Sequence, residues 1–281
     1  MSPLVLVLVL LAALLHAGWN ALIKINEDRL VVMAILAGSS SLIALCLVPF
    51  VAVPIAAAWP FLIASLIIHL GYMIFLVLAY MHADYGQVYP IARGTAPMLA
   101  AIAGTFILGE VLSTTQWVAI ALITGGIVSL AVHGLGSVTH NLKGIGFALI
   151  TACFIATYTI IDAIGARVSG DVHSFAIWLL FLDGLMFSMV AAVRRRGALW
   201  ASVARNWRIG IFAGFISAAA YWIVLWAFTV STVAPVAALR ETSVIFAAVI
   251  AALLLKEGKG WQRFAAPLVV VFGVYLLATA G

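Results

Sequence analysis

Two arginines lie inside apolar stretches that are long enough to cross a membrane. Arg93 stands between two prolines in "YPIARGTAP", which begins at Tyr89, and the apolar run continues to Leu108. Arg240 is followed directly by Glu241 in "PVAALRETSV". A charge inside a membrane span costs at least about 2.5 kcal/mol on insertion scales, so each of these side chains needs a partner or a function. A guanidinium group matches carboxylate or phosphonate, so either arginine is a candidate for binding an anionic group of a substrate, with a structural ion pair as the alternative.

Three further ionisable side chains lie in apolar stretches. Asp183 and His69 are each near the middle of such a stretch, and Asp162 follows Tyr158 by one helical turn. Intramembrane carboxylates and histidines are typical of proton and cation pathways, and they also form hydrogen-bonded structural pairs. We therefore take Asp162, Asp183 and His69 as candidates for proton or cation coupling, and the two aspartates also as possible partners of the arginines.

Aromatic side chains are spaced by about one helical turn along several of the same stretches. Tyr72 follows His69 on one face, and Trp222 and Trp226 are four residues apart beside Tyr221. Such walls can hold an organic ligand or a cation, although an aromatic stripe can also be plain helix packing. The candidate substrate-binding residues are therefore Trp19, Asn20, His69, Tyr72, Tyr80, Tyr89, Arg93, Tyr158, Asp183, Tyr221, Trp222, Trp226, Arg240 and Glu241.

The chain lacks the patterns that would indicate an enzyme or a metalloprotein. It contains no His-x-x-x-His pair, no two aspartates at helical spacing and no nucleophile motif. Cys46 and Cys153 lie in apolar stretches and are interpreted as small packing residues. We therefore expect no catalytic residues, no metal ion and no cofactor.

The composition predicts an all-α membrane protein. Apolar residues make up 66% of the 281-residue chain and charged residues only 8%, too few for the surface of a soluble protein. Only helices fit apolar runs of this length inside a lipid bilayer, because the backbone must bond to itself there. Ten spans are predicted, at about 3–23, 31–51, 59–81, 87–108, 114–132, 144–164, 173–193, 209–230, 233–255 and 262–280.

The positive charges predict an orientation. The odd-numbered loops contain Lys24, Arg29, Lys143, Arg194, Arg195, Arg196, Arg205, Arg208, Lys256, Lys259 and Arg263, whereas the even-numbered loops contain only Arg167. Positive loops remain in the cytoplasm, so both termini are predicted outside, in a multi-pass protein of the cell (inner) membrane. The net charge of +5 is spread over these loops and does not suggest a nucleic-acid partner.

The two halves of the chain repeat one another at an offset of 147 residues. At this offset Arg93 aligns with Arg240, and the pairs Thr95/Thr242, Glu110/Glu257 and Gly126/Gly273 also coincide. We predict a five-helix repeat in residues 1–135 and a second in 144–281. An odd number of spans inverts the second repeat, which is typical of secondary transporters with a central site between the halves. Because the two aligned spans run in opposite directions, we expect the two arginines on opposite sides of the midplane.

Prolines and helix ends give two more expectations. Pro97 removes a backbone donor near Arg93, so we expect a kink or unwound turn between Tyr89 and Pro97, facing the central cavity. Glu110 and Glu257 end the fourth and ninth predicted spans, where the helix dipole disfavours a carboxylate. We expect both to bond to a neighbouring helix end and to be structural.

Four segments carry a family resemblance. "YPIARGTAPMLAAIAGTFILGE" and "PVAALRETSVIFAAVIAALLLKE", with "HAGWNALIK" and "YTIID" in the first and sixth spans, resemble the paired EamA domains of the drug/metabolite transporter superfamily. The resemblance extends over essentially the whole chain. It implies ten helices around a central cavity and the movement of small organic metabolites by alternating access.

We therefore expect a secondary transporter, exporter or importer, of a small polar organic metabolite such as an amino acid, carboxylate or phosphonate, acting as a monomer or homodimer. In this hypothesis Arg93 holds the anionic group. The alternative is a transporter of an organic cation, such as a choline-like molecule or an amine drug, through an aromatic and aspartate-lined site. A non-transporting membrane scaffold or receptor is the remote alternative.

Overall fold

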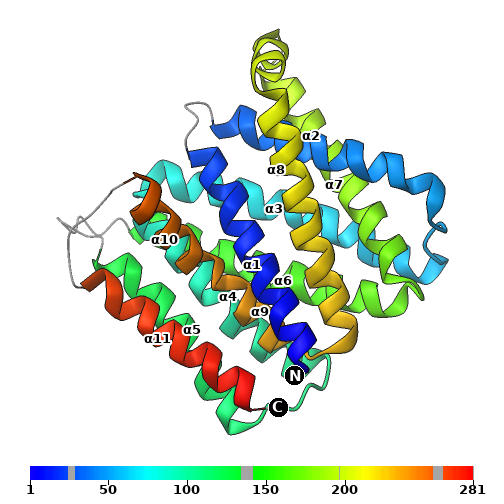
Figure 1. Ribbon diagram of the computed structural model, residues 1–281. Coiled ribbons are helices and arrows are strands. Elements are labelled where there is room, and N and C mark those ends of the chain that lie inside the picture. The colour runs from blue at the N-terminus through cyan, green and yellow to red at the C-terminus, as the bar shows by residue number, and fades with distance from the viewer. Residues whose placement is uncertain (25–28, 134–141, 196, 256–261, 281) are drawn as a thin grey trace.

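The structure is a computed structural model that describes residues 1–24, 29–133, 142–195, 197–255 and 262–280. Within these ranges most residues are helical and no strand occurs. The elements in Figure 1 are α1 (Pro3–Lys24), α2 (Arg29–Leu47), the short turns η1 (Val48–Phe50) and η2 (Ala56–Ala58), α3 (Trp59–His82), α4 (Tyr85–Ile107), α5 (Thr114–His133), α6 (Leu142–Val168), α7 (Val172–Arg195), α8 (Gly197–Val230), α9 (Val233–Glu241), α10 (Ser243–Leu255) and α11 (Gln262–Thr279).

Membrane-length apolar segments occur in six places within the described part of the chain. They are Pro3–Asn20, Ala56–His82, Thr114–Ala131, Leu142–Val168, Val172–Val190 and Trp207–Val230. Two shorter apolar helical segments are Ile35–Phe50 and Ala265–Thr279. The fold class is therefore an all-α membrane bundle, as the composition predicts.

The ninth predicted span is divided into two helices. α9 ends at Glu241 and α10 begins at Ser243, with a turn at Thr242 between them. The backbone N–H and the hydroxyl of Thr242 both bond to the carbonyl oxygen of Leu239, at 3.1 and 2.6 Å. A threonine hydroxyl that bonds back to the preceding turn competes with the regular helical ladder. The interruption therefore coincides with these local bonds of Thr242, and no proline lies at it.

α4 is continuous along its whole length although it contains Pro90 and Pro97. The expected unwound turn between Tyr89 and Pro97 is therefore wrong. Each proline removes one backbone donor, which a membrane helix tolerates where its neighbours pack closely. At Gly94, between the two prolines, a Cβ atom would stand 3.1 Å from the backbone nitrogen of Val128, so α4 and α5 are in close contact there.

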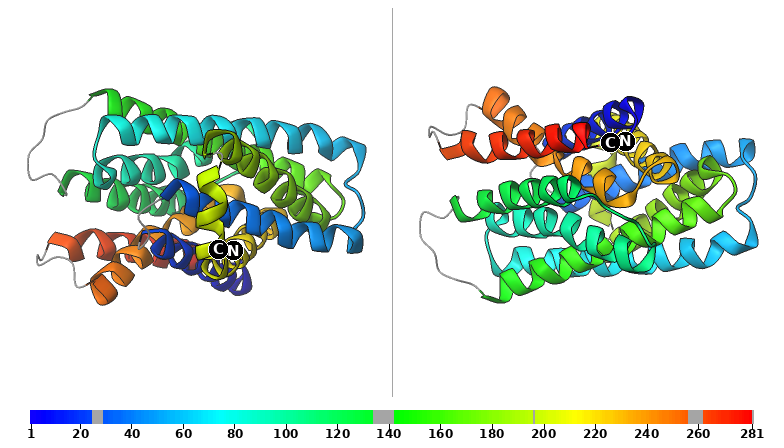
Figure 2. Two further views of the ribbon diagram at one scale, coloured as in Figure 1. Left: turned by 90° about the horizontal axis from the view of Figure 1, so that it is seen from above. Right: turned by 90° about the horizontal axis from the view of Figure 1, so that it is seen from below.

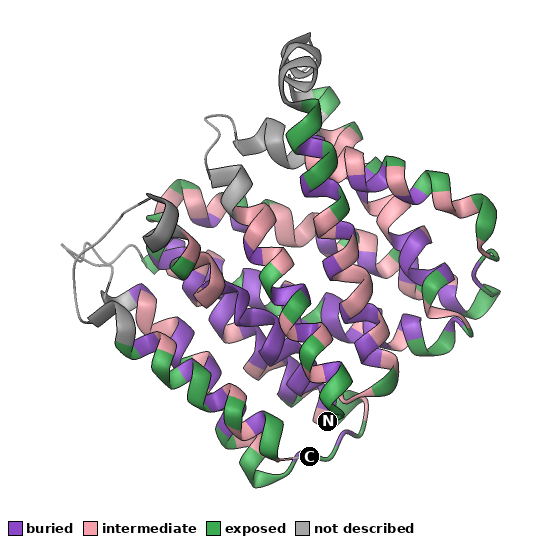
Figure 3. Cartoon of the chain, viewed as in Figure 1, coloured by how far each residue is buried: buried purple, intermediate pink, exposed green. Residues whose placement is uncertain are grey.

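α9 lies at the centre of the bundle. All its residues, from Val233 to Glu241, are buried. It contacts α1, α4, α5, α6 and α8, and Figure 3 shows the buried residues concentrated in this central region. Outside this core α3 packs on α6, α2 on α7, α1 on α8 and α5 on α11, so each half of the chain packs against the other (Figure 2).

The first turn of α1 and the last turn of α11 lie at the same end of the bundle (Figures 1 and 2). The second half therefore returns the chain to the end of the bundle from which the first half starts.

Glycines allow α5 and α11 to approach closely. A Cβ atom at Gly126 would lie 2.6 Å from Cγ2 of Val270, and one at Gly273 would lie 2.8 Å from Cγ1 of Ile123. Small residues at such contacts are typical of helix packing in membranes, where close backbone approach drives association. The two glycines that align in the sequence repeat therefore make corresponding contacts on the two helices.

Substitution of Gly184 tests the same kind of packing between α2 and α7. A Cβ atom at Gly184 would stand 2.3 Å from the carbonyl oxygen of Ala37, which cannot turn away as a side chain can. We expect Gly184→Ala to lower the stability by about 1–3 kcal/mol, measured as a lower melting temperature of the purified protein in detergent. The control is Gly146→Ala in α6, where a Cβ atom would meet nothing within 4 Å. Equal melting temperatures for the two variants would contradict the prediction.

Candidate functional site

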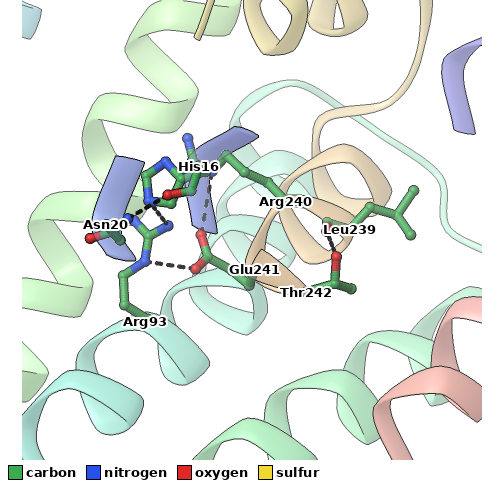
Figure 4. A network of polar contacts seen from close by, with 7 residues as sticks. All are labelled: His16, Asn20, Arg93, Leu239, Arg240, Glu241 and Thr242. Carbon is green, nitrogen blue, oxygen red and sulfur yellow. Dashed lines mark hydrogen bonds and ion pairs between the residues drawn. The ribbon is translucent and has the colours of Figure 1, made fainter. Parts of the chain in front are cut away.

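Two arginines and one glutamate meet where α4 and α9 touch. The carboxylate of Glu241 lies with Oε2 2.8 Å from Nε of Arg93 and with Oε1 3.3 Å from Nε of Arg240 (Figure 4). All three side chains are buried, and Glu241 is only 1% exposed. One carboxylate is therefore shared by a guanidinium from each half of the chain.

Both arginines reach the same carboxylate because each lies near the middle of its path through the bundle. Arg93 is eight residues into α4 and Arg240 seven residues into α9, which corresponds to a rise of about 10–12 Å. The two guanidinium groups therefore lie close together on either side of one carboxylate. Their positions relative to the membrane midplane stay a prediction.

α1 completes this cluster with a histidine that we did not include among the candidate site residues. Nη2 of Arg93 lies 3.3 Å from Nε2 of His16, and since the guanidinium can only donate, Nε2 must accept. The side-chain amide of Asn20 donates to the carbonyl oxygen of His16 at 2.7 Å (Figure 4). The ring of Trp19 packs edge-on against the same histidine, with centroids 4.7 Å apart. The spacing of four residues between His16 and Asn20 was the signal for this residue in the sequence.

Tyr158 of α6 connects the arginine cluster to a second polar group. The guanidinium carbon of Arg240 lies 5.8 Å from the centroid of the Tyr158 ring, within the range of a cation–π contact. The rings of His69 and Tyr72 pack edge-on against the same tyrosine, with centroids 4.3 and 6.0 Å away. Residues from α3, α6 and α9 that we selected from the sequence are therefore in contact.

The second polar group contains the carboxylates of Asp183 and Asp162. Nδ1 of His69 lies 3.2 Å from Oδ1 of Asp183, which joins α3 to α7. The hydroxyl of Tyr221 donates to Oδ2 of Asp162, which joins α6 to α8, and Ser65 lies beside the same carboxylate. Among the described contacts neither aspartate forms an ion pair with Arg93 or Arg240. Their ion-pair partner is Glu241.

Three aromatic candidates lie away from the arginine cluster. Tyr80, near the end of α3, packs beside Val88 of α4 in a separate apolar group. Trp222 and Trp226 line a hollow of about 390 Å³ with Leu8, His173, Ala219 and Ile223. The indole N–H of Trp222 donates to Nδ1 of His173 at 2.9 Å.

Tyr89, the remaining aromatic candidate, packs against the main core and lies close enough to Arg93 to interact with its charge. The described residues contain no group of three or more His, Cys, Asp or Glu side chains that could hold a metal ion. The centre of the bundle therefore brings charged and aromatic side chains together.

Glu110 stabilises the N-terminus of α9. Its Oε1 and Oε2 accept from the backbone N–H of Val233 at 2.8 and 2.9 Å, and Nη2 of Arg167 lies 3.0 Å from Oε1. A carboxylate is favourable at the N-terminus of a helix, where the N–H groups are unpaired and the dipole is positive. The prediction that Glu110 bonds to a neighbouring helix end is confirmed, whereas Glu257 lies outside the described residues.

Known proteins resemble the chain in two respects. Residues 142–279 match a family described as "EamA-like transporter family". A solved structure described as "Crystal structure of protein" aligns with a TM-score of 0.76 at 16% sequence identity, over 99% of this chain and 96% of that chain. At this identity the second likeness shows the fold alone. No curated protein matches the sequence.

Substitution of Glu110 tests its role at α9. Hydrogen bonds to a charged group contribute about 1.5–3 kcal/mol each, so Glu110→Ala should destabilise the protein by at least about 2 kcal/mol. Glu110→Gln retains an acceptor oxygen for the N–H of Val233 and should lose less. Thermal melts of the three proteins in detergent measure the difference. An alanine variant that melts with the parent protein would show that Glu110 does not hold the helix.

Proposed function

We propose that the chain is a secondary transporter that moves a small organic anion across the membrane by alternating access, because residues 142–279 match the EamA-like transporter family. This match and the apolar helices support a multi-pass membrane transporter of small molecules. The proposal adds the anionic substrate, such as an amino acid, a carboxylate or a phosphonate, and the residues that bind it.

The observation that carries this proposal is the excess of positive charge in the buried cluster. Arg93 and Arg240 share the carboxylate of Glu241, so the three groups together carry one net positive charge. An uncompensated charge in a low-dielectric interior is costly, and an anion that binds there removes the cost. Guanidinium groups also offer several donors in a plane, which suits the two or three oxygens of a carboxylate or phosphonate.

Two inverted repeats, in residues 1–135 and 144–281, provide the moving parts in this proposal. At the offset of 147 residues Gly126 aligns with Gly273, and Ile123 aligns with Val270. The contact of Gly126 with Val270 is therefore equivalent to the contact of Gly273 with Ile123. The packing of α3 on α6 likewise corresponds to that of α8 on α1. These equivalences support a two-fold relation between the halves, and rocking one half against the other would open the arginine cluster to each side in turn.

The acidic groups near Tyr158 are proposed to couple transport to a proton or cation. His69 with Asp183 and Tyr221 with Asp162 each bridge two helices, so a change of charge there would alter the contacts between those helices. Intramembrane carboxylates and histidines are the usual groups for this role. Direction, export or import, depends on the gradient to which these groups respond.

The organic-cation alternative receives less support from the positions of the tryptophans. Trp222 and Trp226 line a hollow shared with Leu8 and His173, away from Asp183. An aromatic wall around a cation requires the rings and the carboxylate to face the same ligand. The anionic substrate is therefore the proposal that we favour.

Two variants distinguish these functions. We expect Arg93→Ala to reduce anion uptake into proteoliposomes by at least about tenfold, because a buried charge partner of the substrate is lost. Asp183→Asn should retain anion binding and lose the response of uptake to a pH gradient. Substrates are first selected by their ability to raise the melting temperature of the purified protein. Loss of binding with Asp183→Asn and unchanged uptake with Arg93→Ala would instead favour the cation transporter.

Orientation provides a separate test. We propose that both termini lie on the outer side of the inner membrane, because the odd-numbered loops contain nearly all the positive charges. Alkaline phosphatase fused after Gly281 should therefore be active, since that enzyme requires an oxidising compartment. A fusion of a reporter that is fluorescent only in the cytoplasm should be dark. The reverse pair of results would overturn this orientation.

A further inference from the structure

Two buried glutamates of the chain lie in different electrostatic settings. Glu110 is held at the N-terminus of α9 by two bonds to a backbone N–H and by Arg167. Glu241 lies between the C-terminus of α9 and the N-terminus of α10, where the dipoles of the two helices act on a carboxylate in opposite senses. Its described partners are the two arginines alone. The helix therefore stabilises Glu110 in place, whereas Glu241 is stabilised by the groups that we assign to the substrate.

Glu241 also leaves many donors of both arginines available. A guanidinium has five N–H groups. Among the described contacts Arg240 directs only Nε toward Glu241 and its face toward Tyr158, while Arg93 directs Nε toward Glu241 and Nη2 toward His16. The remaining terminal N–H groups can donate hydrogen bonds to the oxygens of a ligand without displacing Glu241.

We propose that Glu241 is a resident counter-ion that limits the substrate to one negative charge at this site. With Glu241 in place, two guanidinium groups, one carboxylate and one monoanion sum to zero charge. A dianion would leave one negative charge uncompensated in a buried site, which is unfavourable. This inference rests on the proposed function and names the charge of its substrate.

The other charged groups near the cluster have partners of their own. His16 faces Arg93 through an accepting nitrogen and is thus neutral. His69 and Asp183 pair with one another, and Asp162 accepts from Tyr221, so the nearest acidic groups other than Glu241 already have partners. The charge next to the two arginines is therefore determined by Glu241.

The test compares probes that differ by one charge on the same skeleton. Monomethyl succinate and succinate form one matched pair, and dimethyl phosphate and methyl phosphate form another, at mildly alkaline pH. Binding to the purified full-length protein is measured by calorimetry, and the ratio of the dianion Kd to the monoanion Kd is compared between variants. For the parent protein we expect a ratio above one. For Glu241→Gln, which preserves the shape of the side chain, we expect the ratio to fall by at least about tenfold.

Two further variants keep the result interpretable. Arg240→Gln removes a positive charge and should raise the ratio, in the direction opposite to Glu241→Gln. Glu110→Gln removes a buried carboxylate outside the cluster and should leave the ratio unchanged. Melting temperatures of all variants verify that each protein folds. If Arg240→Gln binds too weakly to measure, the comparison of the Kd ratio between Glu241→Gln and Glu110→Gln still decides the test.

The outcomes separate the inference from the function on which it rests. An unchanged ratio in Glu241→Gln, with both probes of a pair still binding, overturns the counter-ion role and leaves the anion site standing. An equal loss of affinity for monoanion and dianion overturns it as well, because Glu241 then only positions the arginines. Failure of all four probes to bind either the parent protein or Glu241→Gln contradicts the anion site itself.

Discussion

A guanidinium group can be buried in a membrane bundle only where a partner shares its charge. Here the carboxylate of Glu241 pairs with the guanidinium groups of both Arg93 and Arg240. Much of the architecture follows from this shared ion pair. α9 must run through the centre of the bundle for Glu241 to reach Arg93 on α4. Small side chains make that approach possible, since Ala100, Ala156 and Ala237 pack together where α4, α6 and α9 meet.

The same centre contains two polar groups of different character, and both contact one aromatic ring. Tyr158 contacts Arg240 of the basic group and His69 of the acidic group. The basic group connects α1, α4 and α9, and the acidic group connects α3, α6, α7 and α8. Tyr158 is therefore a single side chain through which the two groups are in contact.

Periodicity in the sequence predicted most of the central residues, because charge inside an apolar stretch must face a partner and not lipid. Arg93, Arg240, His69 and Asp162 were found in this way. The same reasoning could not place Trp222, because an apolar aromatic residue is stable on a lipid-facing surface as well as inside the bundle. Periodicity defines a face of one helix and leaves open which neighbour that face meets.

The interruption after α9 had a different origin from the one predicted. Prolines suggested a weak point in α4, where close packing keeps the helix continuous. The actual break lies at Thr242, whose hydroxyl bonds to Leu239. Thr242 aligns with Thr95 in the first half, which lies within a continuous helix. The outcome at such a threonine depends on tertiary neighbours, and a sequence alone does not contain them.

The late position of α9 along the chain has a consequence for biosynthesis. α9 has nine residues and two charges, too short and too polar to be inserted as an independent span. Its entry into the bilayer must therefore be assisted by helices that are already assembled and by α10, which follows it. At usual rates of translation, Glu241 is synthesised on the order of ten seconds after Arg93. During that interval the first half contains a guanidinium without its eventual carboxylate.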